Sequence, residues 1–243
     1  MLTVTILQFT TLAMKGGAYV YYFENYVSKN SLSDFISPII EFLSSIGINF
    51  FGSDPVSAGF GLFNAGGIIF MIIGIGLSKM LADKYGKRNV FGVFLFISTL
   101  FILVFYVLSP DSTNLIFGAQ IFHGFFYGIT IPLLWAMIAD VADYSEWKNN
   151  RRATAIIFSA MMVGLKLGLS IGGALVASIL GSYGYVPNSV GEQTESAILG
   201  TKMLVSIFPS IPFLVAAALL FFYVIDKKME DKIEQDLLKK RKS

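Results

Sequence analysis

The sequence predicts an all-α membrane protein that crosses the bilayer with six helices. Hydrophobic residues make up 55% of the 243 residues and charged residues only 14%, whereas a soluble domain carries about 25% charged residues. The apolar residues gather in stretches of about 20, the length with which a helix crosses a hydrocarbon core. No segments of about ten residues with alternating polarity suggest a membrane barrel. This composition excludes a soluble enzyme, a nucleic-acid-binding protein and a disordered protein.

The first three predicted spans occupy the first 108 residues. The first, about 2–27, lacks the basic start of a signal peptide and is therefore predicted to be a membrane helix. The second, about 56–81, ends before a charged turn at 83–88. The third, about 90–108, is the most uniformly apolar. Each must be helical, because backbone polar groups in lipid need partners within their own segment.

The other three spans cover about 115–139, 153–180 and 198–225. Links rich in Pro, Ser, Asn and Arg precede them, which is typical of turns. We therefore divide the chain into a six-helix membrane domain, 1–225, and a charged tail, 226–243. Acidic and basic residues alternate in the tail, which predicts a solvated helix on the membrane surface.

A long link at 28–55 carries apolar residues at helical spacing. The pattern predicts a short amphipathic helix on the outer interface of the membrane. A lid over a substrate site is the alternative interpretation. The apolar residues are Phe35, Ile36, Ile39, Ile40, Leu43 and Ile46.

Basic residues lie mainly on one side of the predicted membrane domain. Of the 18 Lys and Arg residues, seven lie in or beside the links after the second and fourth spans and seven more in the tail. The positive-inside rule therefore places this side in the cytoplasm. We expect a multi-pass protein of the cell inner (plasma) membrane with both termini cytoplasmic.

Two lysines lie at membrane depth. Lys15 is midway along the first span and Lys166 is near the centre of the fifth. A charge at the bilayer centre costs about 2.5–3.5 kcal/mol on insertion scales. Both side chains should therefore face a protein interior or a water-filled cavity. No acidic residue at the same depth offers either lysine a counter-charge.

Three spans carry polar residues along one helical face. They predict an aqueous pathway lined by the first, fourth and fifth spans. The alternative is a set of interhelical hydrogen bonds in a dry bundle. The third span holds few polar residues, Ser98 and Thr99, and is expected to face lipid. The polar faces are Gln8, Thr11, Lys15, Tyr19 and Tyr22; Gln120, His123, Tyr127 and Thr130; and Ser159, Lys166, Ser170 and Gly173.

No motif indicates catalysis, a cofactor or a metal site, so we do not expect an enzyme. The Gly-x-Ser-x-Gly pattern at 168–172 lies inside an apolar helix, whereas hydrolases need it on a strand-to-helix turn. His123 precedes Ser170, the reverse of the order in intramembrane serine proteases, and is interpreted as a hydrogen-bonded wall residue. Two glycine series with four-residue spacing predict close helix packing. They are Gly124 and Gly128, and Gly164, Gly168 and Gly172.

The segment Pro132–Lys148, PLLWAMIADVADYSEWK, followed by Arg-Arg-Ala-Thr at 151–154, resembles the glycoside–pentoside–hexuronide:cation symporters of the major facilitator superfamily. Further matches are Lys-Gly-Gly-Ala at 15–18 and Lys-Leu-Gly at 166–168. The resemblance covers essentially the whole chain. It implies a fold of twelve helices in two halves, with this chain equivalent to helices seven to twelve. The coupling ion, Na⁺ or H⁺, would be bound mainly by the N-terminal six-helix half, which would be the partner of this chain.

The resemblance also implies roles for individual residues. Lys166 matches a family lysine at the sugar and cation sites, and Met162, one turn earlier, falls at a sugar-contacting position. Trp135 matches the family consensus about one turn beyond a sugar-stacking tryptophan. The predicted substrate-binding residues are Lys166, Lys15, Trp135, Tyr127, Tyr22 and Met162. Asp140 and Asp143 with Arg151 and Arg152 are predicted to form a cytoplasmic latch, or alternatively a loop that only sets the topology.

These observations predict half of a secondary active transporter. It would couple uptake of a sugar, glycoside or hexuronide to Na⁺ or H⁺ by alternating access. One alternative is a facilitator-fold transporter of a lysolipid or another amphiphile. Another is a non-transporting membrane scaffold from a truncated gene. The expected contacts are the other half, the sugar and the lipid bilayer, and no nucleic acid.

Overall fold

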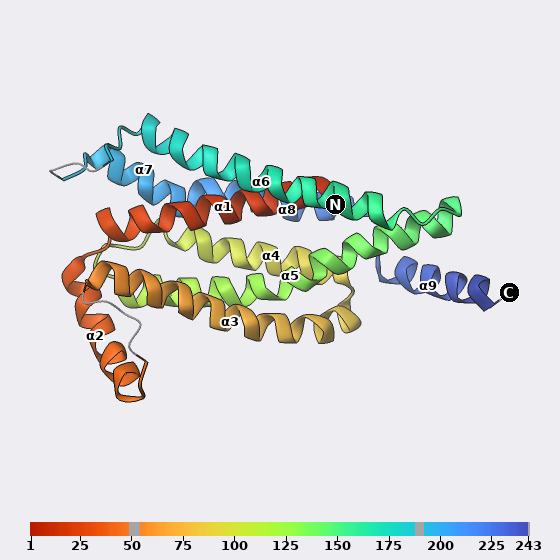
Figure 1. The fold of residues 1–243 in the computed structure, drawn as a ribbon, viewed down its shortest axis with the longest axis horizontal. Coiled ribbons are helices and arrows are strands. Elements are labelled where there is room, and N and C mark those ends of the chain that lie inside the picture. The colour runs from red at the N-terminus through yellow and green to blue at the C-terminus, as the bar shows by residue number, and fades with distance from the viewer. Residues whose placement is uncertain (49–53, 188–191, 243) are drawn as a thin grey trace.

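The computed structural model describes residues 1–48, 54–187 and 192–242, and this part of the chain is almost entirely helical (Figure 1). The predicted all-α fold is confirmed. Predictions for 49–53 and 188–191, within the 28–55 link and the turn around Asn188, lie outside the described residues. The helices are α1 Leu2–Asn25, α2 Lys29–Ser45, α3 Pro55–Tyr85, α4 Lys87–Val104, α5 Thr113–Asn149, α6 Thr154–Ser182, α7 Glu195–Val205, α8 Ile207–Leu220 and α9 Lys227–Lys242.

Within the described ranges, five helical segments are long and apolar enough to cross a membrane: α3, α4, α5, α6 and the segment formed by α7 and α8. The first predicted span, α1, is not among them. Its polar residues, which include Gln8 and Lys15, lower the mean hydropathy of the helix. A multi-pass membrane protein follows from these segments, while the count of six spans stays a prediction.

Two predicted spans differ from the helices observed. The span at 115–139 continues in α5 to Asn149, and the helix ends at Asn150, which adopts the left-handed conformation at φ 53°. The span at 198–225 corresponds to one segment suited to cross a membrane, Glu195–Leu220, but the helix is interrupted at Ser206 and ends at Leu220. Pro209 explains the break: it has no N–H for the carbonyl four residues earlier, and its ring clashes with that carbonyl.

A helix does form within the 28–55 link. In α2, Leu32 and Ile36 are buried in the same apolar cluster as Phe23 of α1 and Phe117 of α5. The far end of α2 leaves Phe42 exposed. Figure 1 shows α2 leaning away from the long helices at one end of the bundle. The placement of α2 on a membrane interface stays a prediction.

Glycines on α6 allow the backbone of this helix to approach that of α1 closely. This helix packs along α1 (Figure 1). A Cβ atom on Gly168 would lie 2.5 Å from the carbonyl oxygen of Ile6, and one on Gly172 would lie 2.5 Å from that of Thr10. The two backbones therefore touch, as in small-xxx-small contacts between membrane helices. The predicted glycine series at 164–172 is thus the seam between α1 and α6.

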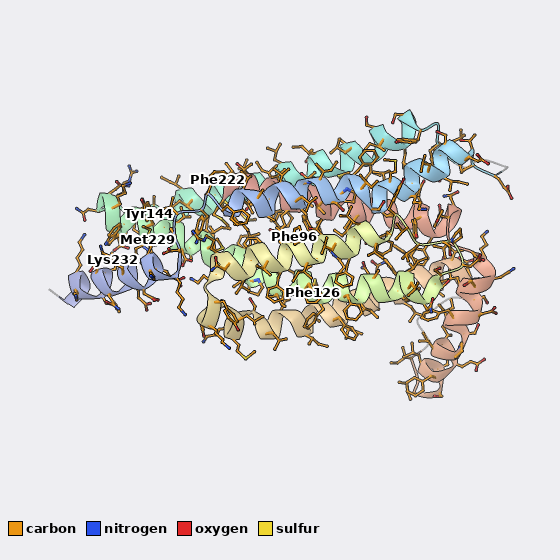
Figure 2. The ribbon with its side chains drawn as sticks, turned by 180° about the vertical axis from the view of Figure 1, so that it is seen from behind. Phe96, Phe126, Tyr144, Phe222, Met229 and Lys232 are labelled. Carbon is orange, nitrogen blue, oxygen red and sulfur yellow. The ribbon has the colours of Figure 1, made fainter. Side chains whose placement is uncertain are left out.

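The tail helix α9 packs on the end of the bundle where the α3–α4 and α5–α6 links lie. We call this the basic end. Ile233 and Leu237 of α9 are buried in a small apolar cluster, with Trp147 of α5 and Tyr223 packed against it. The Trp147 indole N–H donates to Asp236 at 3.0 Å. Figure 2 shows Tyr144 of α5 close to Met229 of α9, which belong to the same cluster. The tail is therefore a helix docked on protein.

Candidate transport site

Lys15 lies in the interior of the bundle, one of the two environments expected from its position. Its side chain contacts the ring of Tyr19, with Nζ 5.3 Å from the ring centroid, and the residue is only 5% exposed. None of the ion pairs found among the described residues involves Lys15. The aromatic face supplies partial negative charge. The buried ammonium therefore rests on a ring rather than on a carboxylate.

The polar faces of α1 and α5 are joined by hydrogen bonds. The Tyr19 hydroxyl donates to Gln120 Oε1 at 3.1 Å, and Gln8 Nε2 donates to the Tyr127 hydroxyl at 3.3 Å. Thr11 of the same face donates to a backbone carbonyl of α8. For these two helices the structure agrees with the dry-bundle alternative and contradicts a pathway open between them. Both faces are buried and most of their polar groups are paired, although Gln8 Oε1 has no hydrogen-bond partner among the described residues.

His123 belongs to the same polar layer. Its Nδ1 lies 3.0 Å from both the hydroxyl and the carbonyl oxygen of Ser98 on α4. Its ring stacks on that of Tyr127 at a centroid distance of 5.8 Å, and the Tyr127 ring stacks on Phe213 of α8. His123 is a hydrogen-bonded wall residue in this structure. Among the described residues, no group of three or more His, Cys, Asp or Glu side chains could hold a metal ion.

Tyr22 lies in an aromatic cluster near the α2 end of the bundle. It is fully buried against Tyr26 and Phe105, and its hydroxyl has no hydrogen-bond partner within the described part of the chain. A ligand could reach that hydroxyl only if this core opened. Tyr22 is therefore buried in this half of the proposed transporter, and its role as a substrate contact stays a prediction.

Lys166 has the opposite environment to Lys15. It lies on an exposed face of α6, together with Met162 and Ser170, while Gly168 on the other face contacts α1. Met162 is 46% exposed. The structure therefore does not bring the two lysines together, because Lys15 points into the core between α1 and α5. Lys166 offers its charge to whatever covers this face of α6.

Trp135 lies between these two environments. It is half-buried on α5 and packs against the apolar cluster that contains Leu134 and Met161 of α6. One part of its indole therefore remains accessible. The accessible residues of the predicted substrate set are thus Lys166, Met162 and part of Trp135, on the two neighbouring helices α5 and α6.

The four predicted latch residues do not form one cluster at the basic end: Asp140 lies in one ion-pair group, Asp143 and Arg152 lie in a second, and Arg151 belongs to neither. Lys87 Nζ lies 2.7 Å from Asp140 Oδ1 and 2.8 Å from Glu230 Oε1 of α9, which we call the basic-end triad. Arg152 instead pairs with Asp143 at 3.3 Å and with a further carboxylate one turn on. The side chain of Arg151 is exposed, and its carbonyl oxygen accepts a hydrogen bond. Sequence reasoning counted Lys87 only as a topology signal and missed Glu230 as its partner.

Tyr223 lies beside the basic-end triad, where it packs against the apolar cluster of α9. Its hydroxyl donates to the carbonyl oxygen of Met137 at 3.1 Å. Burial raises the pKa of Tyr223 well above its usual value, and the carboxylates of Asp140 and Glu230 add to this effect. The phenol therefore stays protonated and keeps its hydrogen bond to α5.

A double-mutant cycle tests the hydrogen bond between α1 and α5. Tyr127→Phe and Gln8→Leu each remove one partner and leave the other buried group unpaired. We expect a coupling energy of about 0.6 kcal/mol, the average for hydrogen bonds between membrane helices. The measurement is unfolding of the four proteins in a denaturing detergent titration. Strictly additive effects of the two substitutions would show that the two groups do not interact.

Comparison with known proteins places the chain in a family. The model of the family described as MFS/sugar transport protein matches residues 41–227. The isoprimeverose transporter of Lactiplantibacillus pentosus is 31% identical over 81% of this chain and 41% of its own length. A glucuronide carrier protein homolog of Escherichia coli is 30% identical over 70% of this chain and 38% of its own length. A putative glycoside/cation symporter of the same species is 29% identical over 68% of this chain and 35% of its own length.

The chain thus spans only about two fifths of the length of these curated relatives or less. All three are transporters by name, and the resemblance to glycoside and hexuronide symporters that rests on the Pro132–Lys148 segment is confirmed. The family model covers more than half of the chain, including α3, α4, α5 and α6 completely. The chain belongs to the MFS/sugar transport protein family of the major facilitator superfamily.

Proposed function

We propose that this chain forms one half of a secondary active transporter that couples uptake of a sugar, glycoside or hexuronide to inward Na⁺ or H⁺. One observation carries the proposal: Lys166 is exposed two residues from the midpoint of α6, a helix suited to span the bilayer. A charge facing lipid at this depth is unfavourable. Its face must therefore be covered by protein or by water, which is what a second half and a substrate cavity provide.

The proposed partner is the N-terminal six-helix half of the same transporter. It would cover the exposed face of α6 and bring carboxylates to Lys166, together with most of the site for the coupling ion. Substrate would lie between the halves, with Lys166 binding oxygen atoms and the accessible part of Trp135 offering an apolar ring. The relatives named for glycosides and glucuronides support a sugar substrate. The one named a glycoside/cation symporter supports cation coupling.

Alternating access would proceed by rocking of the two halves about this midplane site. Because Lys87 binds both Asp140 of α5 and Glu230 of α9, the basic end of this half would move as one rigid unit. We place this end in the cytoplasm from the positive-inside rule. The Asp143–Arg152 pair, which is largely exposed, would be the part of the latch able to exchange partners with the other half.

Uptake measurements on cells expressing the complete transporter that contains this chain test the proposal. We expect Lys166→Met to lower accumulation of a labelled glucuronide or glycoside at least tenfold under an imposed Na⁺ or H⁺ gradient. Lys228→Met, in the exposed first turn of α9, is the matched control and should transport normally. Unchanged accumulation with Lys166→Met would overturn the role of this lysine.

The same assay separates the alternatives. Lysolipid uptake that depends on Lys166, without sugar uptake, would favour an amphiphile transporter. Absence of uptake of either compound, with Lys166→Met and Lys15→Met proteins as stable as the parent, would favour a scaffold. Comparing a glucuronide with the matching neutral glucoside then shows whether the substrate must be anionic.

A further inference from the structure

An apolar groove runs along the outside of the bundle between α4 and α8. Figure 2 shows these helices side by side on the face that carries Phe96 and Phe222. The groove encloses about 630 Å³. Its walls are almost entirely hydrocarbon, and Phe221 at its mouth is 86% exposed. The lining includes Gly92, Val93 and Phe96 of α4 with Leu214, Ala218 and Phe221 of or just after α8.

Small residues make the floor of the groove. A Cβ atom on Gly92 would lie 3.8 Å from Leu220 Cδ1, an ordinary contact, so the glycine leaves room without being required by close backbone packing. Ala217 and Ala218 line the α8 side. The free space therefore follows from the choice of small side chains on both helices, rather than from a gap in their backbones.

One end of the groove is lined by a positively charged side chain. Arg88 and Asn89 line this end, in the first turn of α4, where the helix dipole also favours an anion. Arg88 donates through Nη1 to the carbonyl oxygen of Tyr223 at 3.0 Å. None of the ion pairs within the described residues involves Arg88. A guanidinium has five N–H donors, so most of them stay available for a phosphate.

The position of the groove on the bundle indicates which kind of molecule would bind in it. Both of its helices belong to segments long and apolar enough to cross a membrane, and Arg88 lies at an end of one of them, where a bilayer has its phosphates. From Arg88 to Phe96 the helix rises roughly 12 Å, which accommodates the part of an acyl chain nearest its headgroup. Lys227 lies close to Gly86 at the same end. This basic surrounding disfavours the ammonium group of a zwitterionic headgroup.

We propose that the groove between α4 and α8 is a binding site for one anionic glycerophospholipid. The phosphate binds Arg88, and an acyl chain lies between Val93 and Phe96 on one side and α8 on the other. This site is independent of the proposed transport site, which lies on the exposed face of α6. It therefore holds whether or not the chain transports a sugar.

Native mass spectrometry of the purified chain in detergent tests this site. The probes are phosphatidylglycerol and phosphatidylcholine with identical acyl chains, added at equal concentration. We expect one phosphatidylglycerol to be retained at least threefold more often than phosphatidylcholine. Arg88→Gln should lower the phosphatidylglycerol adduct at least fivefold. Lys79→Gln, an exposed basic residue of α3 outside the groove, is the matched control and should bind as the parent does.

A second variant tests the acyl chain separately from the charge. Gly92→Leu keeps Arg88 but places a large side chain in the part of the groove that the acyl chain would occupy. The adducts of both lipids should therefore disappear from the mass spectrum. Circular dichroism shows whether each variant is folded. If Gly92→Leu does not fold, the test of the lipid site rests on Arg88→Gln alone. Equal retention of the two lipids, or phosphatidylglycerol binding unchanged in Arg88→Gln, would overturn the proposal.

Discussion

Gly128→Ala is expected to separate α3 from α5, whereas Gly118→Ala on the same α5 helix should leave the chain as stable as the parent or slightly more so. A Cβ atom on Gly128 would lie 2.2 Å from the carbonyl oxygen of Met71 and 2.9 Å from its Cα atom. Both atoms belong to the backbone of α3, so no side-chain rotation can relieve the contact. Gly118 has no atom within 4 Å of the corresponding position.

The effect should be large because the contact repeats along the pair. A Cβ atom on Gly124 would lie 2.4 Å from the carbonyl oxygen of Gly67, and one on Gly74 would lie 2.1 Å from that of Phe125. Close approach of backbones is a main source of stability between membrane helices. Overpacking typically costs about 1–3 kcal/mol, and a clash of backbone with backbone should reach or exceed the upper value.

Unfolding in a detergent titration, followed by circular dichroism, measures this difference. Gly128→Ala should shift the transition to much lower denaturant, while Gly118→Ala keeps the parent's midpoint or raises it slightly. Gly118→Ala also controls for helix propensity, since alanine favours a helix over glycine by about 1 kcal/mol. Equal midpoints for the two variants would mean that α3 and α5 are not in backbone contact.

The glycine contacts show what the sequence could predict. The four-residue spacing of Gly124 and Gly128 indicated a close helix contact, because this spacing puts both on one face. It could not indicate that α3 supplies the opposite surface, since the spacing describes only the helix that carries it. In the same way, the sequence predicted that neither Lys15 nor Lys166 faces lipid, but it could not distinguish their environments. Lys15 is buried inside the bundle, whereas Lys166 lies on an exposed face of α6.

Local signals explain part of what was missed. The break at Ser206 could have been expected from Pro209, which a continuous helix does not tolerate without a kink. The basic-end triad had no comparable signal. Lys87, Asp140 and Glu230 are far apart in the chain, and each has an ordinary role as a surface charge in its own segment. The packing of both α4 and α9 on α5 brings them together.

That packing leads to the second large expected effect: Lys87→Met should release α9 from the basic end. Lys87 Nζ lies 2.7 and 2.9 Å from the two oxygens of Asp140 and 2.8 Å from Glu230. The side chains of these two carboxylates are only 15% and 29% exposed. Without the lysine they would face each other with no cation between them. Removing one partner of a fully buried pair costs about 3–5 kcal/mol, and partial exposure reduces this to about 2 kcal/mol.

Hydrogen–deuterium exchange of residues 227–240 measures the release. Lys87→Met should abolish protection in α9 while the middle of α5 stays protected. Lys232→Met is the control, because none of the ion pairs found among the described residues involves Lys232, whose ammonium lies 5.7 Å from the centroid of the Trp147 ring. Adding Glu230→Gln to Lys87→Met should restore part of the protection, since it removes the repulsion with Asp140. If Lys87→Met left α9 fully protected, the apolar cluster around Ile233 would hold the helix without the ion pairs. The double variant would then show no gain, because Lys87→Met would have caused no loss of protection to restore.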